Sequence, residues 1–523
     1  MTRQNNEGPA VPEGGRKAVP IRSVEPRGGG KRTPVNQQAK QLELLPETAE
    51  NSRASAREAV VVADERRSDS ATNAVPKSGN KTRRATPATM EEVASLLREA
   101  FQKVASNRGA AGPDGQSIDE MRKHLPELLP FLARQLIEGK YEPGAIRRVW
   151  IPKSGGGQRG LGIPNVIDRM IQEAVRMALE PLYEPTFHAS SHGFRPGRSC
   201  HTAIAEAREH VSEGYEWVVD LDLKSFFDRV SHQRLMSRLA QRVDDKRLLV
   251  LIGRWLKAEV VMPDGVKVST DEGVPQGGPL SPLLSNIVLD ELDRELAQRG
   301  HRFVRYADDC NVYVRSERAG QRVMASLVEF IERRLRLEVN EAKSAVARTE
   351  ERHFVGFSLR RDPLEGEVEV GLSKRSRERI DERIRALTLR NWGRSLRGCI
   401  RRINEYLLGW FGFFGICTEQ EERTFAVLDA HIRRRLRAIQ LKHWKRRSTI
   451  ARRLVQLGVS RKTAWRRTYC GRKSTWALSH DNAVDRGLRN AYFAERGLVS
   501  LAQRYRARLE QLVAPAQLTL ALG

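Results

Sequence analysis

The sequence predicts an α+β fold, in which a body of helices and short strands is followed by a helical region. Three observations support this prediction. Between about residues 88 and 359, apolar residues at helical spacing alternate with short runs typical of strands. Residues 303–314 have apolar residues on both sides of an acidic turn, which is the pattern of a hairpin. After about Gly371 the pattern is mostly helical.

The N-terminal extension lacks the composition of a folded domain. Residues 1–85 are rich in Gly, Pro, Ser, Asn, Arg and Glu, and they contain no aromatic residue. Such a segment has too little apolar surface to offset the entropy lost on ordering. We therefore predict that residues 1–85 are a disordered basic extension. The first helix is expected from Met90 to about Ala105.

The body is expected to contain the following elements in order. A strand ends at Val149–Pro152, and a tight turn follows at Ser154–Gly157. Asn165 is placed to cap a helix whose apolar residues recur at three-to-four spacing up to Leu179. Trp217–Leu223 has the composition of a strand. We find no internal repeat.

Charge divides the chain into two regions. The net charge is +26 and the pI is about 10.3, which indicates a polyanionic partner. Residues 371–523 carry 34 Lys and Arg against 12 Asp and Glu, a net +22 in under a third of the chain. The sequence therefore predicts a nearly balanced catalytic body and a strongly basic C-terminal binding region.

Cysteine usage and hydropathy exclude several classes of protein. The five cysteines form no Cys-x-x-Cys pair, so neither a disulfide framework nor a zinc knuckle is indicated. No apolar run approaches the roughly 18 residues that span a membrane, and no signal-peptide core follows Met1. We expect a protein without membrane association, cytoplasmic in a bacterium and nucleoid-associated when it is bound to DNA.

Acidic residues at strand ends suggest a metal-dependent chemistry. Nucleotidyl transfer needs two divalent cations about 4 Å apart, held by carboxylates on rigid strands. Asp308 and Asp309 are at the tip of the predicted hairpin, and Asp222 lies near the end of the strand that precedes it. Asp220 lies on the same strand face as Asp222, so the pattern alone does not choose between them.

Three motifs, in this order, resemble the reverse transcriptases. Asp222–Asp228 resembles one acidic motif, Gly273–Pro282 resembles the loop that shapes the nucleotide pocket, and Tyr306–Asp309 resembles the polymerase signature. Further blocks resemble those of group II intron reverse transcriptases: residues 107–115, residues 192–199 and Gly409-Trp410. The likeness covers roughly residues 88–500. The chain thus resembles a bacterial group II intron-encoded reverse transcriptase and maturase.

The resemblance implies a right-hand polymerase. Residues 86–360 would form fingers and palm with a small antiparallel palm sheet, and residues 371–455 an all-helical thumb and maturase (X) domain. Residues 456–523 resemble the DNA-binding segment of the family. Relatives often end in an endonuclease with paired Cys and His, and the absence of such a cluster here predicts that second-strand nicking is missing.

The family implies a role for each matching residue of the active site. Asp222, Asp308 and Asp309 would be catalytic, with two Mg²⁺ held by Asp222, Asp308 and the carbonyl of Leu223. Five residues would contact the deoxynucleoside triphosphate: Lys153, Arg159, Phe227, Gln276 and Lys343. In this group Phe227 would exclude the 2′-hydroxyl. Five residues would contact template or primer: Arg195, Gly277, Gly278, Phe354 and Gly356.

The basic region is expected to bind the intron RNA through charge and through interleaved rings such as Trp410 and Trp476. The RNA-binding candidates are Arg433, Arg434, Arg435, Trp444, Lys445, Arg446 and Arg447. Target DNA is the other expected partner. Two other functions remain open: a maturase that only assists splicing, and a reverse transcriptase of the retron or diversity-generating type.

Overall fold

The sheet that was predicted as the palm, called the palm sheet below, is the centre of the N-terminal body. The computed structural model describes residues 88–152, 157–269, 271–389, 393–471 and 474–521. Four strands pair in the order β6-β7-β3-β8, and every pairing is antiparallel. Their bounds are Arg302–Tyr306 (β6), Asp309–Val314 (β7), Trp217–Leu221 (β3) and Ala345–Arg348 (β8). The predicted hairpin and the predicted strand before it are confirmed, although β3 ends at Leu221 and not at Leu223.

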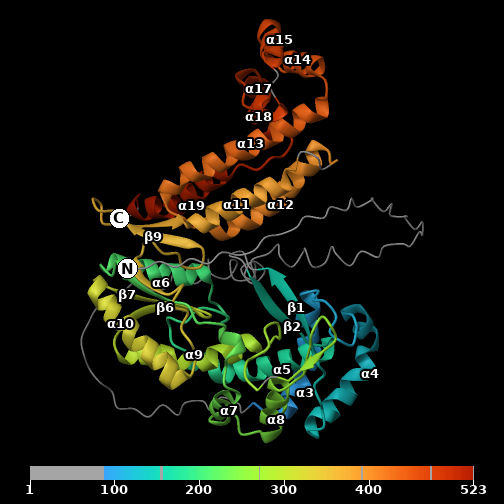
Figure 1. Cartoon of the computed structure of the whole chain (residues 1–523), viewed down its shortest axis with the longest axis vertical. Coiled ribbons are helices and arrows are strands. Elements are labelled where there is room, and N and C mark those ends of the chain that lie inside the picture. Colours follow the sequence, from blue (N-terminus) through green and yellow to red (C-terminus); the bar gives the residue numbers. More distant parts are fainter. Residues whose placement is uncertain (1–87, 153–156, 270, 390–392, 472–473, 522–523) are drawn as a thin grey trace, which may run out of the picture. The chain divides into compact units, whose positions relative to one another are not determined.

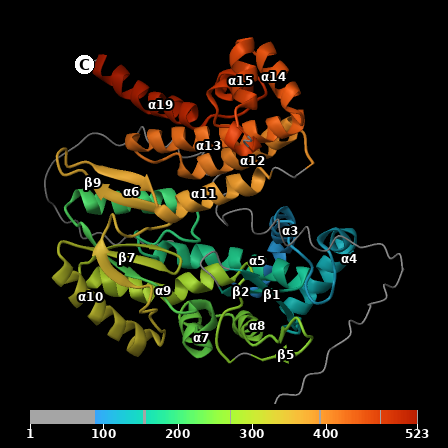
Figure 2. The ribbon, with the colours of Figure 1, turned by 45° about the horizontal axis from the view of Figure 1, so that its top comes forward.

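Helices cover both faces of this sheet (Figures 1 and 2). One core joins the sheet to α9 and α10, and includes Val219 and Val312 of the strands. A second core joins the sheet to α6, and includes Val218 and Tyr313. Alternate residues of one strand thus enter different cores, as the period of a strand requires. The helices are α6 (Cys200–Ser212), α9 (Ser281–Gln298) and α10 (Glu317–Phe330).

In the N-terminal part of the body, α3 packs against the buried helix α5, and α4 packs against α3. The bounds are Met90–Ser106 (α3), Ile118–Ile137 (α4) and Val166–Tyr183 (α5). Ser117 and Glu120 form a capping box at the start of α4. Asn165 is at the N-cap of α5 as predicted, but its side chain makes no cap hydrogen bond. Instead its Oδ1 accepts from the backbone of Asp114 at 3.3 Å.

A second sheet lies beside these helices. Its strands pair in the order β2-β1-β4-β5, and β1 and β2 form an antiparallel hairpin. The bounds are Ile146–Pro152 (β1), Gln158–Ile163 (β2), Val260–Val261 (β4) and Lys267–Val268 (β5). Most of the tight turn predicted between β1 and β2 lies outside the described residues. The loop after β5 reaches this hairpin, because Gly162 donates its backbone N–H to the carbonyl of Gln276 at 2.7 Å.

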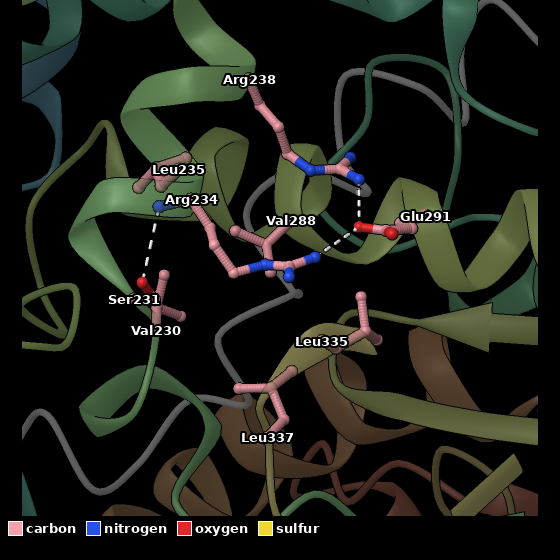
Figure 3. A pocket seen from close by; sticks show the side chains of 9 residues that line it. All are labelled: Val230, Ser231, Arg234, Leu235, Arg238, Val288, Glu291, Leu335 and Leu337. Atoms are coloured by element: carbon pink, nitrogen blue, oxygen red, sulfur yellow. Dashed lines mark hydrogen bonds and ion pairs between the residues drawn. The ribbon is translucent and has the colours of Figure 1, made fainter. Parts of the chain in front are cut away.

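Two short helices, α7 (His232–Ala240) and α8 (Lys246–Leu256), pack near α9. Between α7 and α9 lies a hollow that is lined by apolar side chains and by three charged ones (Figure 3). Arg234 and Arg238 of α7 both donate to Glu291 of α9. The two arginines of this hollow thus share a single carboxylate.

The C-terminal part begins with a hairpin and continues as helices. Strands β9 (Phe357–Arg361) and β10 (Val368–Leu372) pair antiparallel, and helices follow in the described residues that come after. The largest are α11 (Lys374–Leu387), α12 (Leu396–Phe414), α13 (Glu422–Trp444) and α19 (Leu501–Ala521). The smaller ones are α14 (Arg447–Gln456), α15 (Arg461–Tyr469), α16 (Thr475–Leu478), α17 (Asn482–Gly487) and α18 (Asn490–Ala494). The α+β body with a helical C-terminal region is thus confirmed.

The extent of the described chain leaves one prediction untested. The disorder predicted for residues 1–85 concerns residues outside the described part. Among the described residues, we find no helix that is both long and apolar enough to span a membrane.

Candidate active site

Three carboxylates meet at one end of the palm sheet because of strand register. Leu221 of β3 pairs with Cys310 of β7, so the next residues along the ladder, Asp222 and Asp309, come opposite each other. Tyr306 pairs with Asp309 across the hairpin, which leaves Ala307 and Asp308 as a two-residue turn. Ala307 has a φ of 57°, in the left-handed region that such tight turns use.

Asp220 and Asp222 have different partners, which separates the two candidates. Arg352 donates through Nε and Nη2 to one oxygen of Asp220, at 2.8 and 2.6 Å. Asp222 instead accepts from the amide of Asn340 at 2.8 Å, and its side chain is 29% exposed. Asp220 is therefore neutralised inside the protein, and Asp222 is the carboxylate that can reach a ligand.

The carboxylates repel one another. Burial raises the pKa of the Asp308 carboxyl, and the charge of Asp222 adds to the rise, while Arg159 opposes it. Burial also raises the pKa of Asp309 to about 7, and the neighbouring carboxylates contribute, although the Asp309 side chain still reaches solvent. Bringing these acids together is electrostatically costly unless a cation joins them.

The donor set fits hard divalent cations. Mg²⁺ prefers carboxylate oxygens, and it is usually held by one or two carboxylates together with substrate phosphates. Across the described ranges, no group of three or more His, Cys, Asp or Glu side chains is arranged to hold a metal ion by itself. Asp222 and Asp308 are two carboxylates, the number that a Mg²⁺ ion usually takes from protein. Leu223, whose carbonyl is the third predicted ligand, follows Asp222 and bridges to Val339.

Basic residues approach the carboxylates from two sides. Arg159 of β2 is exposed and close enough to Asp308 to influence its pKa. Lys343 is 65% exposed, and its Nζ lies 3.4 Å from Oδ2 of Asp222. Both residues are therefore where a triphosphate would need positive charge. Lys153, the third basic residue predicted here, lies outside the described residues.

Phe227 and the loop of Gln276 lie against each other. Phe227 belongs to the short 3-10 helix Phe226–Asp228, directly after the start of the acidic motif. Its carbonyl accepts from the backbone of Val274 at 2.6 Å, two residues before Gln276. Phe227, which was predicted to exclude the 2′-hydroxyl, and the predicted pocket loop are thus joined by a hydrogen bond. Phe227 is only partly buried and packs on the main core.

Gly277 and Gly278 are required by close packing within the protein. Gly277 has a φ of +122°, and a Cβ there would lie 2.4 Å from the carbonyl of Gly162. A Cβ on Gly278 would lie 2.3 Å from the side chain of Gln172. Both glycines were predicted to contact the template. The structure shows a nearer reason for them, because the loop packs closely on β2 and α5.

The predicted role of Arg195 is corrected. Its guanidinium is 5% exposed and pairs with Glu184 at 2.7 Å. It also donates to the carbonyls of His188 and Ser191, at 2.6 and 2.8 Å. A side chain with these internal partners holds its own loop together and is not placed to contact a template or primer. In the same block the ring of Phe194 is 44% exposed, and this residue has a φ of 60°.

The predicted primer-gripping turn is a tight turn on the C-terminal helices. Phe354 and Phe357 exchange both backbone hydrogen bonds at 2.9 Å, so Val355 and Gly356 form the tip. Both have positive φ, 43° and 92°. The carbonyl of Gly356 accepts from Ser376 Oγ of α11 at 2.7 Å. Phe354 itself is 5% exposed, so its ring supports the turn from inside.

Comparison with known proteins matches two parts of the chain. Residues 151–359 match the family "Reverse transcriptase (RNA-dependent DNA polymerase)", and residues 377–456 match "Group II intron, maturase-specific domain". The chain thus joins a reverse transcriptase domain to a group II intron maturase domain. The first of these two ranges includes all the carboxylates and the predicted nucleotide-binding residues.

Named relatives agree with this assignment. Protein YkfC of Escherichia coli is 42% identical over 209 residues, which are 39% of this chain and 55% of that protein. Group II intron-encoded protein LtrA of Lactococcus lactis is 40% identical over 207 residues, 39% of this chain and 34% of that protein. The chain thus matches between a third and about half of the length of these relatives. A solved Cas6-RT-Cas1–Cas2 complex aligns over 47% of this chain and 42% of the solved chain at 22% identity, with a TM-score of 0.30, too low to add an argument.

The rings around the residues that match the maturase-specific family have a different role from the predicted one. Trp410 and Phe411 are 8% and 9% exposed, and Trp410 packs on Phe414 at a centroid distance of 4.8 Å. Phe414 in turn contacts Phe357 of β9 at 5.2 Å. These rings form the core of the C-terminal helices, so the expectation that they stack on RNA bases is wrong for them.

The predicted RNA-binding residues of this domain divide into two groups. Arg435 donates to Thr388 and the carbonyl of Arg385, which closes the C-terminus of α11. Arg434 lies over the ring of Trp476 at 4.4 Å, and Arg447 donates to the carbonyls of Thr468 and Gly471. These three arginines thus have structural contacts within the protein, and their binding to RNA stays a prediction. Lys445 and Arg446 are the exposed candidates, whereas Arg433 and Trp444 are half-buried and Trp444 packs partly on the core.

The residues that bind Asp220 and Asp222 were not predicted from the sequence. Asn340 binds Asp222 through its side chain, and its backbone N–H donates to the Asp222 carbonyl at 2.8 Å. Arg352 neutralises Asp220. These residues lie more than a hundred positions from their partners, so no local pattern joins them. The only signal was the position of Asn340 close to Lys343, which the resemblance assigns to the triphosphate.

Proposed function

We propose that this chain is an RNA-directed DNA polymerase encoded by a group II intron. It would copy intron RNA into DNA, and it would bind the same RNA to promote splicing and retrohoming. The observation that carries this proposal is the meeting of Asp222, Asp308 and Asp309 at the end of the palm sheet, in a reverse transcriptase domain that a maturase domain follows. Each half of the proposal rests on one of the two domains.

The carboxylates would hold two Mg²⁺, through Asp222, Asp308 and the Leu223 carbonyl. When bound, these ions would activate the attacking 3′-oxygen and neutralise the leaving pyrophosphate. The protein's own contribution is to fix the acids in place before the substrate arrives. Asn340 orients Asp222, and the β6–β7 turn sets Asp308 beside it. Asp309 would add charge without being a principal ligand.

Recognition of the incoming nucleotide would fall to residues on several elements. Arg159 and Lys343 would contact the triphosphate, together with Lys153. Support comes from their charge and from the closeness of Arg159 and Lys343 to the carboxylates. Phe227 would close the space beside the sugar 2′-position, and Gln276 would border the base. The hydrogen bond from Val274 to Phe227 would hold Phe227 and the loop of Gln276 at a constant distance from each other.

Template and primer would pass between the loops beside the catalytic turn. Gly277 and Gly278 keep their loop close to the protein, which leaves its outer side for the template. The Val355-Gly356 tip would contact the primer end. Phe194 replaces Arg195 as the residue of its block that is able to make contact, because its ring is exposed.

RNA and DNA binding would use the basic C-terminal region. Arg433, Lys445 and Arg446 would contact intron RNA phosphates. For target DNA we propose the exposed side of α15, where Arg461, Lys462 and Arg466 accompany a stacked pair of rings. The rings are Trp465 and Tyr469, with centroids 5.6 Å apart and planes at 3°. Binding to DNA would place the protein at the bacterial nucleoid.

A maturase that only assists splicing is the main alternative, and the complete set of carboxylates argues against it. Primer extension on an RNA template with Mg²⁺ decides between them. We expect activity in the wild type and none in Asp308→Ala, whose splicing assistance stays largely intact. Asp119→Ala removes an exposed carboxylate on α4 and serves as the control. Absence of cDNA from the wild type would favour the alternative, and full activity in Asp308→Ala would refute the site.

A further inference from the structure

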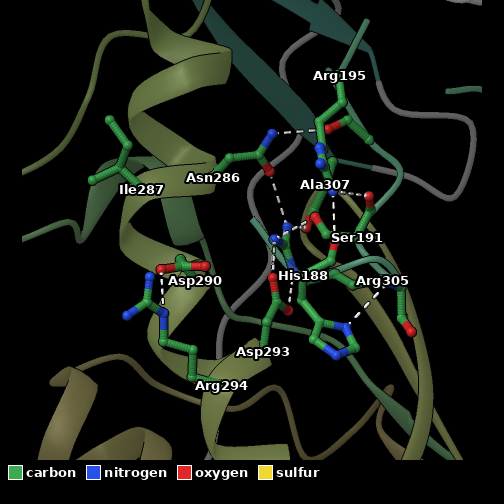
Figure 4. A network of polar contacts seen from close by, with 12 residues as sticks. His188, Ser191, Arg195, Asn286, Ile287, Asp290, Asp293, Arg294, Arg305 and Ala307 are labelled. Atoms are coloured by element: carbon green, nitrogen blue, oxygen red, sulfur yellow. Dashed lines mark hydrogen bonds and ion pairs between the residues drawn. The ribbon is translucent and has the colours of Figure 1, made fainter. Parts of the chain in front are cut away.

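A charged network lies directly beside the catalytic turn. Arg305, the residue before Tyr306 in β6, is fully buried, and so is its ion-pair partner Asp293 of α9. Nε and Nη2 of Arg305 donate to the two Asp293 oxygens at 2.7 and 2.5 Å (Figure 4). This is the two-pronged geometry in which a guanidinium binds a carboxylate most strongly.

The remaining donors of Arg305 extend the network in two directions. Nη1 donates to the Ala307 carbonyl at 2.8 Å and to Asn286 Oδ1 at 3.0 Å, and Nη2 donates to Ser191 Oγ at 2.7 Å. With the two bonds to Asp293, all five guanidinium N–H groups have an acceptor. A lysine has three donors on one atom and could not reproduce this set.

The bond to Ala307 is the informative one. Its carbonyl belongs to the peptide that leads into Asp308, so Arg305 fixes the orientation of the turn just before the metal-binding residue. Ala307 has a positive φ, which a non-glycine residue adopts only when its surroundings hold it there. Arg305 supplies such a constraint from inside the protein.

The opposite side of the turn is held by the same network. A Cβ on Gly193 would lie 2.1 Å from the backbone nitrogen of Ala307, so the Gly193 backbone lies directly against the turn. Asn286 donates to the Gly193 carbonyl at 2.9 Å while its Oδ1 accepts from Arg305. One side chain of α9 thus ties the guanidinium to the loop that presses on the turn.

Stability alone is a poor explanation for this arrangement. Removing two charges from water costs several kcal/mol per ion in general, and apolar residues of similar size often serve a core equally well. The network instead fixes the position of the guanidinium, because each of its N–H groups donates to one particular acceptor. Catalysis depends on such geometry, since a displacement of about 1 Å can cost about a hundredfold in rate.

We infer that Arg305, Asp293 and Asn286 are positioning residues that hold the Ala307-Asp308 turn in its metal-binding orientation. The inference rests on the proposed polymerase function. None of the three touches the substrate, and their effect is transmitted through the Ala307 carbonyl and the Gly193 loop.

The test compares Asn286→Ala and Arg305→Lys with the wild type in the full-length protein. The matched control is Glu291→Gln. Glu291 lies on the same helix, α9, but its ion pairs are with Arg234 and Arg238 in the hollow of Figure 3, and the substitution breaks these pairs. Four quantities are measured: the melting temperature, the Kd for template–primer, the single-turnover rate of primer extension, and the Mn²⁺ affinity by electron paramagnetic resonance. Glu291→Gln reveals how much activity a broken ion pair on α9 costs by itself.

We expect Asn286→Ala and Arg305→Lys to slow extension by about tenfold or more and to weaken Mn²⁺ binding, with the template–primer Kd changed by less than about twofold. Glu291→Gln should keep its rate and its Mn²⁺ affinity. Folded variants with wild-type rate and Mn²⁺ affinity would overturn the inference. If both variants failed to fold, the network would serve stability alone, and the inference of a positioning role would also be overturned. An inactive wild type would instead count against the proposed function.

Discussion

Arg352 holds Asp220 through two donors on a single carboxylate oxygen, at 2.8 and 2.6 Å. Two residues further on, Asp222 accepts an amide hydrogen bond from Asn340 and remains partly exposed. Asp220 and Asp222 thus differ because each has a different partner, Arg352 or Asn340, that is distant in sequence. Only Asp222 is placed to bind a metal.

The first prediction follows from this division. Asp222→Asn should abolish primer extension, because the amide loses the charge that a divalent cation requires. Asp220→Asn should reduce the rate by about tenfold at most, but it should lower the melting temperature, since removing one partner leaves the other partly buried charge without compensation. Rates and thermal melts of both variants test this. Equal rates for the two variants would contradict the assignment of Asp222.

The second prediction concerns Phe227. Phe227→Ala should admit ribonucleotides, because the smaller side chain no longer collides with a 2′-hydroxyl. We expect the preference for dNTP over NTP, measured as a ratio of kcat/KM values, to fall by about a hundredfold, which corresponds to roughly 2.7 kcal/mol. Phe226→Leu is the control, since Phe226 is 2% exposed and belongs to the core. It should lose stability while the preference is retained; an unchanged ratio in Phe227→Ala would remove Phe227 from the sugar pocket.

The third prediction concerns the loop of Gly277. Gly277→Ala should lower activity strongly, because its Cβ would meet the Gly162 carbonyl at 2.4 Å in a backbone conformation that L-residues rarely adopt. Gly265→Ala is a matched control, with a φ of +87° and no atom within 4 Å of the added Cβ. It should cost about 1 kcal/mol of stability and little activity. Similar decreases in activity for the two variants would mean that backbone strain alone matters.

The fourth prediction concerns RNA binding. Replacing Arg433, Lys445 and Arg446 together by Gln should weaken intron RNA binding and reduce the slope of log K against log salt, by about 0.7 to 0.9 for each phosphate that is no longer neutralised. The control is Arg435→Gln, which removes the hydrogen bonds to Thr388 and Arg385. It should lower the melting temperature and leave the slope nearly unchanged. A larger reduction of the slope in the control than in the triple variant would place the RNA surface around Arg435 instead.

The sequence predicted the parts of the fold that depend on local pattern. The hairpin around Asp308, the helix from Met90 and the strand before Asp222 each depend on a short, continuous stretch of sequence. All three are present in the structure. The register that brings Asp222 opposite Asp309 is a property of two strands that are far apart in the chain. The family resemblance implied that Asp222 and Asp308 share a site, but the register itself was not predicted.

Prediction from sequence was least successful where the same residue type serves two purposes. A basic or aromatic side chain looks alike in sequence whether it faces RNA or its own protein. Arg195, Arg435 and Trp410 were assigned to nucleic acid, yet they contact Glu184, Thr388 and Phe414. Only the folded structure reveals these partners, because no sequence pattern says which way a side chain points.

The turn at Val355-Gly356 is also joined to the N-terminal cap of α11. The Gly356 carbonyl accepts from Ser373 N and from Ser376 Oγ, and Ser373 is the N-cap residue of that helix. The helix cannot tilt at this end without carrying the turn along or breaking both bonds. If RNA binding shifted this helix, the tip that would touch the primer would therefore shift with it. By reciprocity, the affinity for primer and the affinity for intron RNA would be linked in one folded chain.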